Sequence, residues 1–261
     1  MESIEQLTEK CLFKGTCQRY NGACAKNCYP FVFLHGTSGV DGFVRSTNIP
    51  KRYKGLLLKD LTVDPVNEKA YNLFTRYVAD FNKYVREKNV GLFIYSEPTP
   101  TNPLGTGTGK TSVATAILNE YLVFRAKEKL KGGTDLLAPP CLFISASEYQ
   151  NVYNSQFRGV SKDIQQENAD RFYKLKDLIK SVELLVIDDI AVRDMTEGFR
   201  NELFEIIDYR ATNDLTIILT SNYSLTEVAH IVGERIASRI EGATGLVAMT
   251  GEDKRRGGLF R

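Results

Sequence analysis

The sequence has no apolar run near the roughly 18 residues that a membrane-spanning helix needs, so no membrane partner is expected. Residues 1–5 lack the basic and apolar regions of a signal peptide, which favours the cytoplasm. No repeat recurs along the 261 residues, which excludes a solenoid. What remains is a globular composition, 43% hydrophobic and 25% charged, that suits one main domain and a small appendage.

Excess charge of one sign is also absent, because the net charge is only +2. The charges are nevertheless uneven. Residues 1–59 contain nine Lys and Arg against four Asp and Glu, a local charge of +5 that leaves −3 for the remainder. Lys254, Arg255, Arg256 and Arg261 make the last residues basic, either to meet phosphate or as a solvated tail.

Cysteine is scarce except in one short segment. Four of the five cysteines lie within eighteen residues, and His35 follows them: Cys11, Cys17, Cys24 and Cys28. Disulfides are rare in a reducing compartment, so thiolate ligands of a structural Zn²⁺ are the natural hypothesis, with His35 as a possible substitute ligand. The gaps of five, six and three residues differ from paired C-x₂-C knuckles, and free thiols or an iron–sulfur cluster remain alternatives. The fifth cysteine, Cys141, starts an apolar run and is expected in the core.

A glycine-rich run follows the apolar stretch 91–95 and opens a helix-forming segment at Ser112. It is typical of a nucleotide-phosphate loop, in which backbone N–H groups surround the β-phosphate at a helix N-terminus. Its lysine would reach the β- and γ-phosphates and its last threonine would ligate Mg²⁺. The run reads Gly105, Thr106, Gly107, Thr108, Gly109, Lys110 and Thr111.

Two features depart from the usual phosphate-loop pattern. Leu104 occupies the position of the first glycine, and the proline-containing segment 98–103 makes the connection from the preceding strand unusually long. A flexible Gly/Thr linker is the alternative interpretation of this stretch.

Polar residues follow two further apolar runs. Asp188 and Asp189 end the run 184–187, where a nucleotide-hydrolysing fold places the carboxylate that holds Mg²⁺ and the one that polarises the attacking water. Asn222 follows the run 215–219, and a parallel sheet would bring it beside Asp188. The alternatives are a solvated strand end and an ordinary turn or helix cap.

Arg235 and Arg239 share one face of a short helical segment because they are four residues apart. Such arginines can reach a neighbouring subunit's nucleotide, or can form an exposed basic face. Tyr149, Tyr153 and Phe157 are spaced four apart on an expected helix, where a core position is favoured over stacking on bases.

Apolar strands alternate with helical segments from residue 91 onward, which predicts an α/β fold with a parallel sheet covered by helices. The spacing of Tyr71, Phe74, Val78, Phe81 and Val85 predicts an amphipathic linker helix within 61–88. The expected strands are 91–95, 141–145, 184–188 and 215–220, and the expected helices 112–130, 171–180 and 196–212.

Together these motifs resemble the AAA+ ATPases that load bacterial replicative helicases, the DnaC/DnaI type. The similarity covers about residues 89–256 and includes Arg200, the segment 203–207 and Arg210. Its motifs are GTGTGKT, LLVIDDI, TSN, GERIASRI and the final GEDKR. The resemblance implies Walker A residues Lys110 and Thr111, a Walker B pair Asp188 and Asp189, sensor 1 Asn222, arginine finger Arg239 supported by Arg235, and a sensor 2-like Arg255.

The resemblance also implies a function: an ATP- and Mg²⁺-dependent loader of the hexameric replicative helicase onto single-stranded DNA at the initiation of replication, in a bacterial or phage system. Residues 1–60 would bind the helicase, 61–88 would form a linker helix, and 89–261 would form a self-associating AAA+ ATPase domain. Many AAA+ enzymes have glutamate at the position of Asp189, so slow hydrolysis is expected. The alternatives are an IstB-type transposition helper ATPase and a nucleotide-gated adaptor with little hydrolysis.

Overall fold

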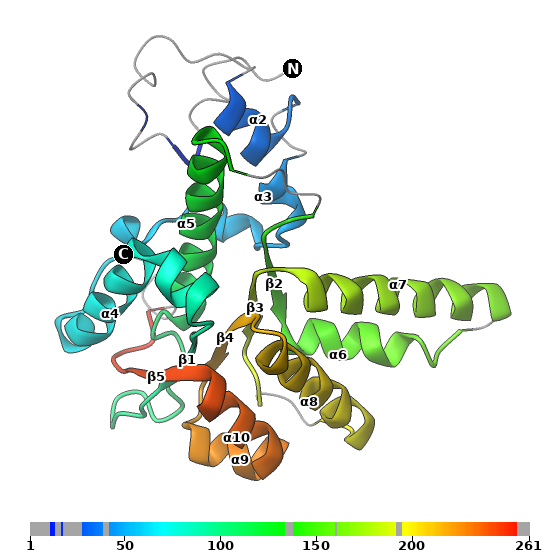
Figure 1. The fold of residues 1–261 in the computed structure, drawn as a ribbon. Coiled ribbons are helices and arrows are strands. Elements are labelled where there is room, and N and C mark those ends of the chain that lie inside the picture. The colour runs from blue at the N-terminus through cyan, green and yellow to red at the C-terminus, as the bar shows by residue number, and fades with distance from the viewer. Residues whose placement is uncertain are drawn as a thin grey trace, which may run out of the picture.

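The computed structural model describes residues 11–13, 17, 28–38, 42–133, 138–159, 161–191 and 195–254. At its centre lies a five-stranded sheet whose neighbouring strands are all parallel (Figure 1). The order is β2-β3-β4-β1-β5, and the strands are β1 (Gly91–Ser96), β2 (Cys141–Ser145), β3 (Leu184–Asp188), β4 (Thr216–Ser221) and β5 (Thr244–Met249). Helices cover both faces, which confirms the predicted α/β architecture.

The two faces of the sheet bury separate cores, because alternate strand residues point to opposite sides. In β1, Leu92 and Ile94 face one core and Phe93 faces the other. The first core is covered by α4 (Glu68–Ala79) and α5 (Lys110–Leu130), with α2 (Tyr29–His35) and α3 (Phe43–Ser46) beyond them. The second is covered by α6 (Ala146–Ser155), α7 (Lys162–Ser181), α8 (Glu197–Thr212), α9 (Leu225–Val232) and α10 (Glu234–Ala243).

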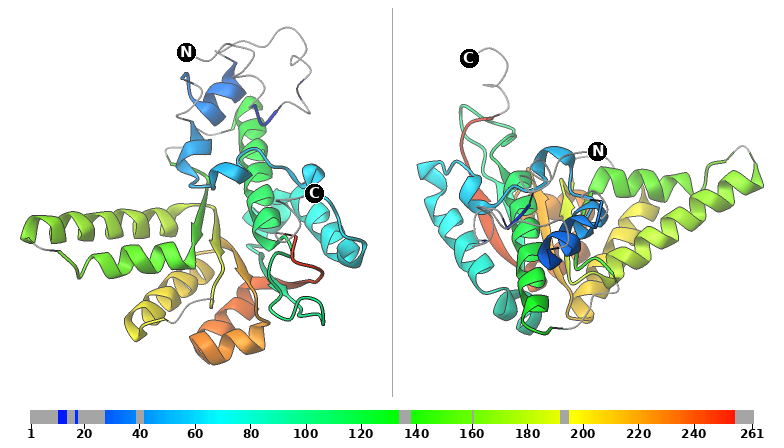
Figure 2. Two further views of the ribbon diagram at one scale, coloured as in Figure 1. Left: turned by 180° about the vertical axis from the view of Figure 1, so that it is seen from behind. Right: turned by 90° about the horizontal axis from the view of Figure 1, so that it is seen from above.

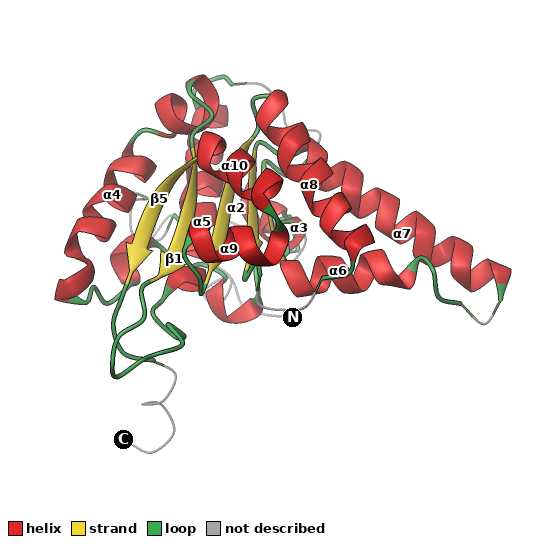
Figure 3. Cartoon of the chain, turned by 90° about the horizontal axis from the view of Figure 1, so that it is seen from below, coloured by secondary structure: helices red, strands yellow, loops and turns green. Residues whose placement is uncertain are grey.

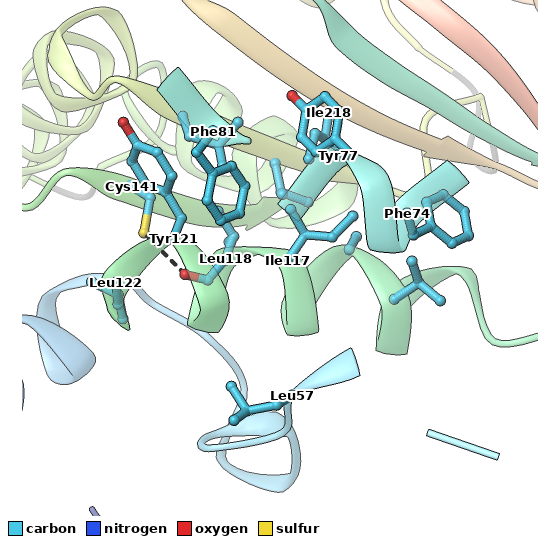
Figure 4. Close-up of a cluster of buried hydrophobic side chains, with 14 of the residues drawn as sticks. Leu57, Phe74, Tyr77, Phe81, Ile117, Leu118, Tyr121, Leu122, Cys141 and Ile218 are labelled. Atoms are coloured by element: carbon cyan, nitrogen blue, oxygen red, sulfur yellow. Dashed lines mark hydrogen bonds between the residues drawn. The ribbon is translucent and has the colours of Figure 1, made fainter. Parts of the chain in front are cut away.

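Helix α5 is buried along most of its length, which fixes the position of its N-terminus at the sheet edge. Tyr121 packs edge-on against Phe81, with ring centroids 5.0 Å apart (Figure 4). On the next strand, Cys141 is fully buried and its Sγ lies 3.8 Å from the Leu118 carbonyl oxygen. Burial also raises the pKa of the Cys141 thiol, so this cysteine is the core residue that its position predicted.

The predicted linker helix is shorter than 61–88. Pro65 starts a 3₁₀ turn, Pro65–Asn67, and α4 begins only at Glu68. Asp80 then breaks the helix, and a π-helical turn, Asn82–Glu87, completes the segment. The apolar spacing still located the buried side chains, because Phe74 and Phe81 are fully enclosed.

Helices α6 and α7 extend away from the sheet as a two-helix arm, with α6 beside α7 (Figures 1 and 2). Helix α7 begins nine residues before the predicted start, because Ser161 caps its N-terminus and the polar stretch that follows has no apolar period. Tyr149 is buried, as predicted, and Tyr153 packs on Phe172 and Phe199. The core prediction is wrong for Phe157, which is 64% exposed near the end of the arm.

A buried arginine near the C-terminal end of α8 contacts the C-terminal end of α7 and the first residue of β4. Arg210 is fully enclosed, and its guanidinium donates to the carbonyl oxygens of Ile179 (2.6 Å), Thr216 (2.7 Å) and Glu183 (3.3 Å). Burial lowers the Arg210 pKa to about 9, so the group stays charged at neutral pH. Across the ranges that the structure describes, no helix is both long and apolar enough to cross a membrane.

Candidate nucleotide-binding site

The carboxyl ends of the parallel strands meet at one edge of the sheet (Figure 3), and a pocket lies there over the start of α5. Most of the predicted phosphate-loop residues line it, together with two of the predicted catalytic residues, with Lys254 of the GEDKR motif, and with two residues that the motifs did not indicate. The lining residues are Arg52, Tyr53, Gly107, Thr108, Gly109, Lys110, Thr111, Ser112, Asp189, Asn222 and Lys254.

Lys110 is 5% exposed, and its ammonium donates to several oxygens at the pocket. Nζ donates to Asn222 Oδ1 at 2.8 Å, to the Gly105 carbonyl at 3.2 Å and to Ser96 Oγ at 2.5 Å. These acceptors fix the position of the ammonium group at the pocket. A phosphate oxygen bound there would be an anionic acceptor for the Lys110 ammonium.

Backbone conformation and close contacts explain why glycine occupies two positions of the phosphate loop. Gly105 has φ +58°, and a Cβ there would lie 2.5 Å from the Ser96 Cβ. Gly107 has φ +67°, and a Cβ there would overlap the Asp253 carboxylate. Leu104 instead has no left-handed backbone conformation and is 69% exposed, so the loop tolerates leucine in place of the usual glycine.

Asn102, in the proline-containing segment, holds the phosphate loop through hydrogen bonds that the sequence did not indicate. Its Nδ2 donates to the carbonyls of Thr106 at 2.8 Å and Gly251 at 2.9 Å, and its Oδ1 accepts from the Thr106 N–H at 3.3 Å. The long connection therefore supports the phosphate loop and ties it to the segment after β5.

Asp188 lies at the end of β3, in hydrogen-bond contact with the loop threonine. Thr111 Oγ1 is 3.0 Å from both Asp188 carboxylate oxygens, and Thr220 Oγ1 donates to Asp188 Oδ1 at 2.6 Å. Burial, with a further contribution from the nearby Asp189, raises the Asp188 pKa to about 6, while the hydroxyls and Lys110 oppose the rise. A threonine hydroxyl and a carboxylate side by side are oxygen ligands of the type that Mg²⁺ prefers.

Asp189 turns away from the strand in a left-handed conformation, with φ +58°, and Ala191 repeats it with φ +65°. The Asp189 N–H donates to Thr220 Oγ1 at 2.9 Å, so one hydroxyl fixes both members of the acidic pair. Aspartate tolerates this backbone better than most residues. The turn makes Asp189 line the pocket beside Asn222.

The segment after β5 lies along the phosphate loop. Thr106 Oγ1 donates to Asp253 Oδ2 at 3.0 Å, and Asn67 exchanges two hydrogen bonds with the backbone of Thr250, at 2.7 and 2.9 Å. Lys254 thereby reaches the pocket. Arg255, the predicted sensor 2-like residue, lies outside the described residues.

The stretch before α4 supplies Arg52 and Tyr53. The Arg52 guanidinium lies 4.5 Å from the centre of the Tyr53 ring, and Asn119 of α5 donates to the carbonyls of Tyr53 and Leu56, both at 2.9 Å. The basic charge of residues 1–59 did not indicate a phosphate contact, and no local motif tied this stretch to a phosphate loop some fifty residues later.

The two predicted interface arginines lie on α10, outside the residues that line the pocket. Arg239 Nε is 2.7 Å from Asp208 Oδ1, and the Arg235 guanidinium lies 4.6 Å from the centre of the Phe204 ring. The subunit therefore does not direct its own predicted arginine finger at its own phosphate loop.

The predicted zinc ligands fall only partly within the described residues, because Cys24 lies outside them. Cys11, Cys17 and Cys28 are half-buried, and within the described ranges no group of three or more Cys, His, Asp or Glu is placed to hold a metal. His35 is buried, and its Nε2 has no hydrogen-bond partner within the same ranges. Burial lowers the His35 pKa to about 4, so its imidazole is neutral, the form that binds metals.

Comparison with known proteins agrees with this geometry. No family model matches the chain. The replicative helicase loader DnaC of Escherichia coli K12 is 26% identical over 165 residues, which cover 63% of this chain and 54% of that protein. A crystal structure of the DnaC helicase loader superposes with a TM-score of 0.55 at 24% identity over 77% of this chain and 99% of that one. A crystal structure of DnaI gives 0.56 at 20% identity over 80% and 95%.

The fold is that of the AAA+ domains, with a phosphate loop and strand-end acids at one edge of the parallel sheet. Among such domains, the chain resembles the DnaC/DnaI-type helicase loaders, as its motifs predicted. The chain spans about half the length of the curated loader that it matches.

Proposed function

We propose that this protein is an ATP-dependent loader of a hexameric replicative DNA helicase onto single-stranded DNA. The observation that carries the proposal is the convergence of Lys110, Thr111, Asp188 and Asn222 at one sheet edge, in a chain whose sequence resembles DnaC. The basic charge of residues 1–59 and the arm formed by α6 and α7 are the two parts of the chain that we assign to the helicase and to DNA.

ATP would bind with its phosphates in the loop 105–111. Lys110 would contact the β- and γ-phosphates, and the N–H groups at the start of α5 would surround the β-phosphate. Thr111 and Asp188 would hold Mg²⁺, which would neutralise charge on the phosphates. Arg52 and Tyr53, which line the same pocket, would contact the nucleobase side of the ligand, because a half-buried aromatic ring beside an exposed guanidinium offers a surface for stacking.

Hydrolysis would use Asp189 and Asn222 on the attacking water. Asp189 is one methylene shorter than the glutamate that many AAA+ enzymes carry, so its carboxylate would reach the water less well and turnover would be slow. A nucleotide-gated adaptor with little hydrolysis is the functional alternative that Asp189 favours. Measuring turnover with and without single-stranded DNA and helicase distinguishes a stimulated ATPase from such an adaptor.

Arg239 would act in a neighbouring subunit, where its charge would stabilise the γ-phosphoryl group. Arginines of this kind contribute about 10³- to 10⁵-fold in rate in well-studied GTPases. Arg239→Ala should leave ATP affinity nearly unchanged and remove stimulated hydrolysis. Mixing Arg239→Ala subunits with Asp188→Asn subunits should restore activity, since each variant keeps the group that the other has lost.

Single-stranded DNA would contact the end of the arm. The Phe157 ring is exposed, and so are Arg158 and Lys162, which are close to it in the sequence. An aromatic ring beside cations is the combination that binds unpaired bases without sequence preference.

A structural Zn²⁺ in the cysteine segment remains part of the proposal. The neutral, buried and unpartnered His35 Nε2 fits a metal ligand, as do the thiolates that four clustered cysteines can provide. Metal analysis of the purified chain should show about one zinc per chain, lost when Cys24 and Cys28 are replaced by serine. A folded chain without metal would refute this part alone.

Size-exclusion chromatography with light scattering tests the partner. The protein is mixed with the cognate helicase in ATP and in ADP, beside Lys110→Ala and the control Lys69→Ala, which changes an exposed lysine of α4. We expect a complex in ATP with the wild type and the control, and weakened assembly with Lys110→Ala. Absence of any complex, together with ATP-dependent filaments on duplex DNA, would instead favour an IstB-type transposition helper.

A further inference from the structure

Helices α8 and α10 carry two matched contacts that hold both arginines of α10. Phe204 lies under the Arg235 guanidinium, and one helical turn further along α8, Asp208 pairs with Arg239. Each helix contributes residues four apart, so the contacts form two successive rungs between the helices. Arg239 is therefore held in a defined place in the single subunit.

That place is away from the subunit's own nucleotide pocket. Helix α10 leads directly into β5, whose first residue, Thr244, pairs with Gly91 at the start of β1. Arg239 lies in the second half of α10, outside the residues that line the pocket, whereas the phosphate loop follows the opposite end of β1. The Arg239 and Asp208 side chains are 53% and 33% exposed, so a second copy of the chain can approach them.

We infer that Asp208 is a positioning residue, which holds the Arg239 guanidinium in the unassembled subunit and releases it to the γ-phosphate bound by a neighbouring copy. The inference rests on the proposed function, because it takes Arg239 to act in the adjacent subunit. Asp208 offers a carboxylate oxygen to the same guanidinium that a phosphate oxygen would bind. The two acceptors therefore compete for one cation.

The expected strengths of the two contacts make this exchange possible. An exposed ion pair changes an equilibrium by about 1.4- to 5-fold. An arginine that reaches the transferring phosphoryl group changes the rate by about 10³- to 10⁵-fold. Asp208 can thus bias the position of Arg239 in a lone subunit without preventing its transfer in the assembled state.

Mixed subunits test the inference. Acceptor subunits carry Arg239→Ala and keep an intact nucleotide site, whereas donor subunits carry Asp188→Asn and keep Arg239. ATP turnover then arises where a donor's arginine meets an acceptor's nucleotide. The ATP turnover of the acceptor is measured at increasing concentrations of the Asp188→Asn donor. The same titration is repeated with donors that also carry Asp208→Asn, Asp208→Glu or Glu241→Gln. Glu241 is an exposed acid on α10 and serves as the control.

We expect the Asp208→Asn donor to reach half-maximal stimulation at about 1.4- to 5-fold lower concentration, because its arginine is no longer held by a carboxylate. The Asp208→Glu and Glu241→Gln donors should follow the parent donor. If the Asp208→Asn donor matches the control or needs a higher concentration, the holding role is refuted while action between subunits stands. If no mixture turns over ATP, action between subunits and the inference fail together. A folding defect would appear as a lower unfolding temperature of the donor alone.

Discussion

Replacing Asp188 with asparagine should stabilise the nucleotide-free protein while it removes the carboxylate proposed for Mg²⁺. Asp188 is 5% exposed, and its pKa is raised from 3.8 to about 6, chiefly by burial and then by Asp189. At pH 7 the ionised carboxylate therefore costs the folded state about 3 kcal/mol relative to the unfolded chain. Asparagine carries no charge, and its Oδ1 can still accept from Thr111 and Thr220.

The pH dependence follows from the direction of the pKa shift. Because the folded state binds the Asp188 proton more tightly than the unfolded state, this group's contribution to stability is greatest below about pH 4 and is lost as the pH rises through about 6. The advantage of Asp188→Asn should therefore be largest near pH 7, about 1–3 kcal/mol after any loss of hydrogen-bond quality. It should approach zero near pH 4.

Urea unfolding in EDTA and without nucleotide, repeated from pH 4 to pH 8, measures this difference. Asp189→Asn serves as the comparison, because it removes the neighbouring like charge and leaves Asp188 buried, so a smaller gain is expected. Equal stability of wild type and Asp188→Asn at pH 7, or a loss on substitution, would refute the claim that the acid at the end of β3 is held at an energetic cost. Adding Mg²⁺ and ATP should stabilise the wild type more than the variant, since only the wild type keeps the carboxylate.

Three further substitutions test other parts of the structure. Arg210→Met should lower the free energy of unfolding by about 3 kcal/mol or more, because three carbonyls lose a charged donor. Arg200→Met, at an exposed position, should change it little. Equal urea midpoints for the two variants would contradict the buried role of Arg210. Tyr53→Ala should raise the Kd for ATP by about 2- to 10-fold and leave tripolyphosphate binding unchanged in calorimetry, and an equal loss for both ligands would place Tyr53 on the phosphates instead. Phe157→Ala should weaken binding of single-stranded DNA by about 1–3 kcal/mol in fluorescence anisotropy, and unchanged affinity would exclude the end of the arm as a stacking site.

Features set by local chemistry could be predicted from the sequence. The phosphate loop, the apolar runs of β1 to β4 and the acids after β3 each carry a short-range signal, and the structure brings Lys110, Asp188 and Asn222 together at the predicted edge. Strand β5 was missed because it is an edge strand with an exposed Leu246 and a glycine, so it shows neither a buried run nor clean alternation.

Features that depend on chain segments meeting in space could not be predicted. Thr220 was expected only as the last residue of the strand 215–220 and part of the TSN motif, yet its hydroxyl binds both Asp188 and the Asp189 backbone. Asn102 lies in a loop whose prolines suggested only an irregular connection, yet it supports the phosphate loop. Tyr53 reaches the pocket because Asn119 holds its backbone on α5, a contact that spans 66 residues of sequence. Such roles come from tertiary hydrogen bonds, which leave no periodic pattern.

Helicase assembly on closed circular single-stranded DNA tests the central claim most directly. The cognate helicase hexamer is incubated with circular single-stranded DNA and ATP in three reactions: with this protein, with Lys110→Ala, and without either. The helicase bound to the circles is measured after gel filtration. We predict that the wild type places helicase on the circles and that Lys110→Ala does so far less. Equal amounts of circle-bound helicase with and without the protein would contradict the account.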